Sequence, residues 1–112
     1  MIPSPEVVFL GRDNYIGQIL NQNGIPFPNL SGVTQINLEL GGTTIPSTGP
    51  ASGPIQWNQP GFATGEVRLF LGMQAGLIAS DTPMTAYIVT YDLTHPDGLV
   101  WGSFQILIQS GI

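Results

Sequence analysis

Apolar and polar residues alternate along several short stretches of this chain, and turn residues separate the stretches. The clearest alternation covers residues 33–40, where three aliphatic residues fall on one face of an extended chain: Ile36, Leu38 and Leu40. The residues between them are polar, and a period of two with polar partners is typical of a half-buried β-strand. Gly41 and Gly42 follow, so we expect the strand to end there.

Two other stretches alternate in the same way. Residues 65–71 direct three aliphatic residues toward a core: Val67, Leu69 and Leu71. Phe70 then faces outward, beside two charged residues. Residues 100–109 direct four apolar residues toward the core: Val100, Phe104, Ile106 and Ile108. Trp101 and Leu107 fall on the opposite face of this strand, where we expect them to form an exposed apolar patch.

Residues 86–91 are apolar or β-branched on both faces, which is typical of a central strand with neighbours on either side. The segment after them, 92–98, contains Pro96, Asp97 and Gly98. Proline pre-sets the first torsion of a turn, and glycine accepts the positive φ that hairpin loops require. We therefore expect the central strand and the final strand to be antiparallel neighbours.

Weaker strand patterns complete the chain at four places: residues 7–10, 14–20, 43–45 and 55–58. The 15 Gly and 10 Pro leave no stretch long enough for a substantial helix. Residues 73–80 have room for one helical turn, 46–54 read as a loop, and Asn23-Gly24 predicts a tight turn. Seven to eight short strands at this spacing predict an all-β fold, namely an immunoglobulin-like antiparallel β-sandwich.

The length of 112 residues fits one domain, which we place at residues 1–112 with a proline-containing N-terminal arm at 1–6. Hydrophobic residues make up 42% of the chain, which excludes a disordered tail. Charged residues make up only 8%, against about 25% in a typical domain. Two interpretations stay open: a neutral surface of amides and hydroxyls, or a surface largely buried against partners, because permanent interfaces are depleted in charge.

The charge and the cysteine count exclude several classes of function. The net charge is −5, and two arginines without lysine cannot form a phosphate-binding patch, so we expect no nucleic-acid partner. Without cysteine, disulfides, thiolate chemistry and Cys-based zinc sites are impossible. No apolar stretch approaches the roughly 18 residues that span a bilayer, so we expect no membrane partner. A secretory signal requires a basic region before an apolar run. The N-terminus has no such basic region, so we expect no secretory signal.

Candidates for catalysis or metal binding are few. His95 is the sole histidine and lies in a Pro-Asp-Gly turn, without a second metal ligand or a nucleophile motif beside it. Asp92, Asp97 and Asp81 offer carboxylates for glycoside hydrolysis or for calcium, but aspartates are common in the turns of β domains. We therefore predict that the protein is not an enzyme and holds no cofactor or metal.

Aromatic residues and prolines are the remaining candidates for binding. Five aromatic residues have rings that could stack on sugars: Tyr15, Trp57, Phe62, Phe70 and Trp101. The alternative for the two tryptophans is the core or a protein interface. Pro3 and Pro5 lower the entropic cost of docking an extended arm against a neighbour, although a solvated connector explains them equally well.

Three segments resemble small structural proteins of tailed bacteriophages: Gly11-Arg12-Asp13-Asn14-Tyr15-Ile16, Thr34-Gln35-Ile36-Asn37-Leu38 and Gly98-Leu99-Val100-Trp101-Gly102-Ser103-Phe104. The resemblance extends loosely over nearly the whole chain and rests on strand and turn signatures, with no catalytic residues among them. It implies an immunoglobulin-like module of the virion, assembled in the host cytoplasm.

From these observations we expect a non-enzymatic virion component that binds other virion proteins and copies of itself. A tail or fibre-attachment accessory is slightly favoured over a capsid decoration protein. The candidate interface residues are Pro3, Pro5, Trp57, Phe70, Trp101 and Leu107. A carbohydrate-binding adhesion module, using Trp57, Trp101 or Tyr15, is the alternative.

Overall fold

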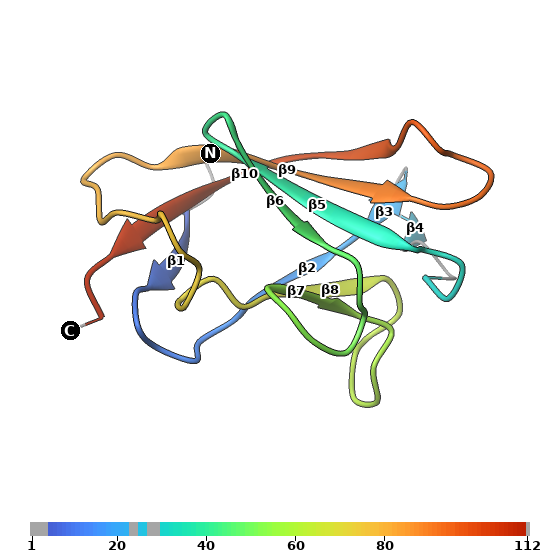
Figure 1. The fold of residues 1–112 in the computed structure, drawn as a ribbon, viewed down its shortest axis with the longest axis horizontal. Coiled ribbons are helices and arrows are strands. Elements are labelled where there is room, and N and C mark those ends of the chain that lie inside the picture. Colours follow the sequence, from blue (N-terminus) through green and yellow to red (C-terminus); the bar gives the residue numbers. More distant parts are fainter. Residues whose placement is uncertain (1–4, 23–24, 27–29, 112) are drawn as a thin grey trace.

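The computed structural model describes residues 5–22, 25–26 and 30–111, and these residues form β-strands and turns without a helix (Figure 1). The strands are β1 Glu6–Phe9, β2 Ile16–Ile19, β3 Asn21–Gln22, β4 Ile25–Pro26, β5 Gln35–Leu40, β6 Thr43–Ser47, β7 Ile55–Trp57, β8 Glu66–Leu69, β9 Met84–Tyr91 and β10 Leu99–Gln109. The all-β prediction is therefore confirmed.

The strands form two facing layers (Figure 1). One layer is a five-stranded sheet with the order β1-β10-β9-β5-β6, and the other is a three-stranded sheet with the order β2-β8-β7. The short strands β3 and β4 pair only with each other. The two layers make the predicted sandwich, but its larger sheet is mixed and not antiparallel throughout, because β1 runs parallel to β10.

The central strand lies where the sequence predicted it. β9 pairs antiparallel with β10 on one side and with β5 on the other, and the β9–β10 loop closes with backbone hydrogen bonds from His95 to Asp92 and from Gly98 to His95. Gly98 has a φ of 91° there, as the turn requires. The Asn23-Gly24 turn expected between β3 and β4 lies outside the described residues.

Two loops differ in detail from the prediction. Residues 73–80 contain turn residues but no helical turn. The strand expected to end at Ile45 continues to Ser47, whose hydroxyl donates a hydrogen bond of 2.8 Å to the carbonyl of Ile55. This bond joins the two sheets and is buried, so the loop after β6 begins only after Ser47.

The core consists of the alternate residues that the two sheets direct toward each other. Ile36, Leu38 and Leu40 from β5 are buried, as predicted, and so are Val67 and Leu69 from β8. Burial of such aliphatic side chains stabilises a fold by about 1.5–3 kcal/mol each relative to exposure. The largest fully buried side chain is Trp57, in β7, at 1% exposure.

β10 departs from the predicted alternation at its start. Val100 is opposite Val89 and Ser103 is opposite Tyr87, so β10 has one extra residue between these pairs, which is a β-bulge. Gly102 lies in the bulge with a φ of 92°. The extra residue reverses the facing of every residue before it: Val100 is 64% exposed, not buried, and Trp101 packs against the core, not outward. Residues after the bulge face as predicted.

The inward position of Trp101 is fixed by a polar contact. Its indole Nε1 donates a hydrogen bond of 2.8 Å to Oγ1 of Thr90, a side chain with 0% exposure near the C-terminal end of β9. A buried hydroxyl without a hydrogen-bond partner costs about 1–3 kcal/mol. The bond from Trp101 avoids this cost for the Thr90 hydroxyl. Trp101 is therefore part of the structure of the five-stranded sheet.

We predict that Gly102→Ala lowers the free energy of unfolding by about 1–2 kcal/mol, because a left-handed backbone is unfavourable for an L-residue. A Cβ at Gly102 meets nothing within 4 Å, so backbone strain is the only expected effect. Urea unfolding measures it, with Ser103→Ala, next to the bulge on the same strand, as the control. Equal stability of Gly102→Ala and wild type would contradict the prediction.

Candidate binding surfaces

The structure separates the six predicted interface residues. Trp57 lies in the core, so its ring is not available to a ligand or a partner. Trp101 is turned inward by the bulge, which corrects its expected outward position. Pro3 lies outside the described residues, and Pro5, next to the start of β1, is half-buried.

Phe70 and Leu107 do face outward, but on opposite layers of the sandwich. Leu107, in β10, is half-buried and lies opposite Val7 of β1 on the five-stranded sheet. Phe70 follows β8 of the three-stranded sheet and is also half-buried. The apolar patch expected from Trp101 and Leu107 therefore does not exist in that form, and each outer sheet surface has its own set of side chains.

The first surface is the outward side of β1, β10 and β9, which we call the apolar sheet face: Val7, Phe9, Tyr87, Val89, Val100 and Leu107. Val100 is 64% exposed, Tyr87 43% and Phe9 39%. All nine charged residues of the chain lie within the described residues, and none occupies an outward position on these three strands. Glu39 of the neighbouring strand β5 lies opposite Tyr87 and borders this surface, so the charge-free part is limited to β1, β9 and β10. Large side chains on such a surface are typical of protein interfaces.

Neutral polar side chains complete this outer surface. Gln105 Nε2 donates a hydrogen bond of 3.0 Å to Oγ1 of Thr85, its neighbour across β9 and β10. On β5, Gln35 Nε2 donates to Oδ1 of Asn37 at 2.7 Å, and Asn37 Nδ2 donates to the Tyr91 hydroxyl at 3.4 Å. Because these amides donate to protein groups, fewer of their hydrogen bonds are made with water, and a partner that covers them would displace less of it.

The second surface lies on the outward side of the three-stranded sheet, and we call it the aromatic–arginine platform: Tyr15, Phe62, Arg68 and Phe70. The Arg68 guanidinium carbon lies 4.5 Å from the centre of the Tyr15 ring and 4.1 Å from the centre of the Phe62 ring. The Tyr15 and Phe70 rings are 5.5 Å apart at 42°. Cation–π contacts at these distances hold the guanidinium between two rings.

Glu66 completes the platform from the same strand as Arg68. Arg68 Nε donates a hydrogen bond of 2.7 Å to Glu66 Oε2, and Nη2 lies 3.4 Å from Oε1. The hydrogen bond from Arg68 lowers the pKa of the Glu66 carboxyl below its ordinary value of 4.5, and the backbone N–H of Ala63 adds to this effect. Glu66 therefore balances the charge of Arg68 and fixes its orientation.

Next to Arg68 and Glu66, the neighbouring strand β2 has a glycine, which carries no side chain. Gly17 is opposite Arg68 in the ladder, and its missing side chain leaves room for the Glu66 carboxylate: a Cβ there would lie 3.1 Å from Glu66 Oε2. Tyr15 directly precedes the same strand, and 48% of its surface is exposed. Gly17 therefore leaves the surface beside Arg68 without a side chain, and the Tyr15 ring is the exposed ring next to it.

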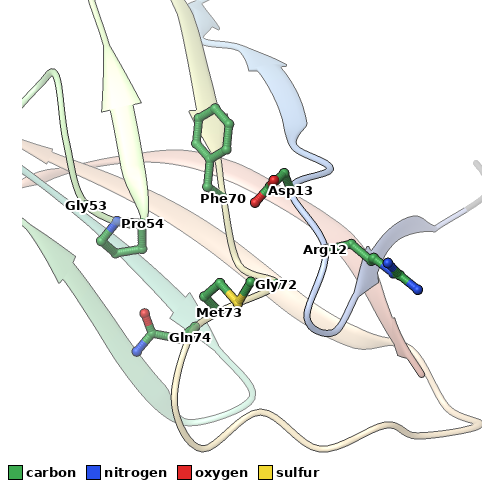
Figure 2. A pocket seen from close by; sticks show the side chains of 8 residues that line it. All are labelled: Arg12, Asp13, Gly53, Pro54, Phe70, Gly72, Met73 and Gln74. Atoms are coloured by element: carbon green, nitrogen blue, oxygen red, sulfur yellow. The ribbon is translucent and has the colours of Figure 1, made fainter. Parts of the chain in front are cut away.

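A pocket of about 280 Å³ adjoins the platform at Phe70 (Figure 2). Figure 2 shows Phe70 and Asp13 close together above Met73 and Gln74, while the Arg12 side chain points away. Arg12 Nε instead donates a hydrogen bond of 2.8 Å to the carbonyl of Gly111. Its guanidinium therefore holds the C-terminal end of the described chain and is not aimed into the pocket.

Another pocket, of about 350 Å³, lies at the end of the sandwich between the β5–β6 turn and residues 75–80. It is lined mostly by aliphatic residues, among them Leu40, Leu77 and Met84. Ile78 at its rim is 77% exposed. The lining of this pocket has no charged residue, and its polar side chains are those of Thr43 and Ser80.

Among the candidate residues for catalysis or metal binding, the structure brings His95 and Asp92 together. His95 Nδ1 lies 2.9 Å from Asp92 Oδ1, which also accepts the backbone N–H of His95 at 2.7 Å. Burial raises the pKa of the Asp92 carboxyl, but the hydrogen bonds with His95 lower it, and the result lies below the ordinary value. No group of three histidine, aspartate or glutamate residues gathers in the described chain, nor does it contain a helix long and apolar enough to cross a membrane.

Comparison of the chain with models of known protein families, with curated proteins and with solved structures finds no match. The surfaces must therefore be interpreted from their own chemistry. The sequence identified three of the four platform residues as candidate stacking residues, namely Tyr15, Phe62 and Phe70. It missed Arg68 as their centre, although Arg68 and Phe70 share the outward side of the predicted strand.

We predict that Glu66→Gln is less stable than wild type at pH 7 and that the difference shrinks in acid. A lowered folded pKa contributes stability that is complete above 4.5 and is lost as the pH falls through the lowered pKa. Urea unfolding of both proteins between pH 7 and about pH 3 measures this difference. Glu6→Gln, at the exposed start of β1, is the control. A pH-independent difference would show that the carboxylate charge is not involved.

Proposed function

We propose that this protein is a non-enzymatic structural component of a tailed-bacteriophage particle. It docks to neighbouring virion subunits, including copies of itself, as a tail or fibre-attachment accessory or as a capsid decoration. Its place of action is the virion, and it uses no cofactor. The observation that carries this proposal is the apolar sheet face, which spans three strands and has no charged residue among its outward positions.

The apolar sheet face suits a protein partner better than a small ligand. It is a broad surface of an extended sheet, and its exposed side chains come from β1, β9 and β10, which are hydrogen-bonded to one another. Small-molecule sites are concave with a few convergent polar groups, whereas protein interfaces combine apolar and aromatic side chains with little charge at their centre. The low charge of the whole chain, 8%, supports the same interpretation.

The strand order supports an immunoglobulin-like version of the sandwich. In that fold, strands B, E and D form one sheet, and G, F and C form the other, extended by C′ in variable-type domains. The orders β2-β8-β7 and β10-β9-β5-β6 follow the same sequence of connections. The buried tryptophan departs from that pattern, because Trp57 lies in β7 and not in β5, the equivalent of strand C.

The segments that resemble phage structural proteins form strands and turns of the fold. Residues 34–38 lie largely in β5, and residues 98–104 form the end of the β9–β10 loop and the bulge. Residues 11–15 form the loop that leads into β2, and Ile16 is the first residue of that strand. Each segment contributes to the backbone course or to the core and none supplies a catalytic group, which is in keeping with a module that binds other proteins.

We predict that Val100→Asp weakens docking about tenfold or more, because it places an unpaired charge at the most exposed aliphatic position of the apolar sheet face. The measurement is binding of the tagged protein to purified virion subunits of its phage, together with its oligomeric state by light scattering. Ile19→Asp, at a 43% exposed position on the other sheet, is the matched control and should dock normally.

Two results would overturn the proposal. In the first, the wild-type protein is monomeric and binds none of the purified virion subunits. In the second, Val100→Asp and Ile19→Asp weaken docking equally, which would show that the apolar sheet face is not the interface. Circular dichroism of each variant confirms that its fold is unchanged.

A further inference from the structure

We propose that the aromatic–arginine platform binds a neutral saccharide. The platform is on the layer opposite the apolar sheet face, so one domain would dock through its larger sheet and bind sugar through its smaller one. This inference goes beyond the proposed function, because a structural subunit needs no ligand on its outer side. It rests on the geometry of Tyr15, Arg68 and Glu66.

Tyr15 provides the stacking surface. Its ring is 48% exposed and is held in place by Arg68 on one side and by Phe70 at 5.5 Å. The C–H-rich face of a pyranose ring is apolar and carries slight positive charge, which complements the negative face of an aromatic ring. A ring fixed by its neighbours loses little side-chain entropy on binding, so the contact is pre-organised.

Arg68 provides directed hydrogen-bond donors. Its Nε and Nη2 are engaged by Glu66, and Nη2 also lies 3.5 Å from the carbonyl of Gly61. Nη1 donates to none of the described residues. The guanidinium is planar and is held between the rings of Tyr15 and Phe62, so the two Nη1 donors have fixed directions. Adjacent hydroxyl oxygens of a sugar are suitable acceptors for them.

The charge balance favours a neutral ligand over an acidic one. Glu66 lies 2.7 Å from Arg68 and neutralises it, and the whole chain has a net charge of −5. A carboxylate or sulfate on a ligand would face this negative field, and the other cation nearby, Arg12, directs its guanidinium away from the pocket and toward the carbonyl of Gly111 (Figure 2). Hydroxyl groups avoid this repulsion and still accept hydrogen bonds.

Hollows at both ends of the platform indicate a chain of several sugar units. Beyond Phe70 lies the 280 Å³ pocket, with Asp13 and Gln74 in its lining. Beyond Phe62 lies a hollow of about 190 Å³, with Asn58, Gln59 and Thr64 in its lining. Carboxylate, amide and hydroxyl groups beside aromatic rings are suited to binding sugar hydroxyls. A linear oligosaccharide would therefore extend from one hollow to the other across Tyr15.

The test is a glycan array that carries neutral hexose oligosaccharides and acidic oligosaccharides, followed by titration of the best-bound neutral one. We expect wild type to bind neutral members. Tyr15→Ala should weaken this binding about tenfold or more, and Tyr15→Phe, which keeps the ring, should retain it. Arg68→Lys keeps the charge but loses the planar donors, so it should also weaken binding.

Tyr87→Ala is the matched control, since Tyr87 is a tyrosine of similar exposure, 43%, on the opposite sheet. It should bind sugar normally, and Tyr15→Ala should dock to virion subunits normally, which separates this inference from the proposed function. The inference is overturned if no neutral oligosaccharide binds, if only acidic ones bind, or if Tyr15→Ala binds as wild type does. Loss of subunit docking in Tyr15→Ala would instead identify the platform as a protein interface.

Discussion

The structure depends on the burial of alternate residues between two facing sheets. In each strand, one side must leave water, and the largest side chains that do so include Trp57, Ile36 and Leu38. Because successive residues of a strand point to opposite sides, burial of one set fixes the direction of the other. The outer surfaces of both sheets are therefore consequences of the core, and a single added residue in a strand changes them.

The bulge at Gly102 is the place where such a residue was added. It turns Trp101 toward Thr90 and exposes Val100, so one glycine exchanges an aromatic surface residue for an aliphatic one. The indole becomes a structural element, with its N–H bonded to a buried hydroxyl. The outward side of the same sheet becomes aliphatic at that end, which is what gives the apolar sheet face its most exposed position.

The two outer surfaces have different chemistry on one small scaffold. On β1, β9 and β10 the five-stranded sheet presents separate apolar side chains beside neutral amides, with Glu39 of β5 at their border, as suits contact with another protein. The three-stranded sheet concentrates its aromatic rings around one ion pair, which gives fixed donors and a stacking ring. A domain with nine charged residues depends on such neutral groups for recognition, because it has few ion pairs to offer a partner.

The sequence by itself determined most of the strands, the inward residues of β5 and β8 and the β9–β10 hairpin, because period-two burial and turn chemistry are local properties. It also limited the chemistry, since composition excludes cysteine-based sites whatever the fold. The tertiary structure alone decided the parallel pairing of β1 with β10, the facing of Trp101 and Val100, and the burial of Trp57. Only the fold could gather Tyr15, Phe62 and Phe70 around Arg68, because these residues come from different segments and meet through packing between strands.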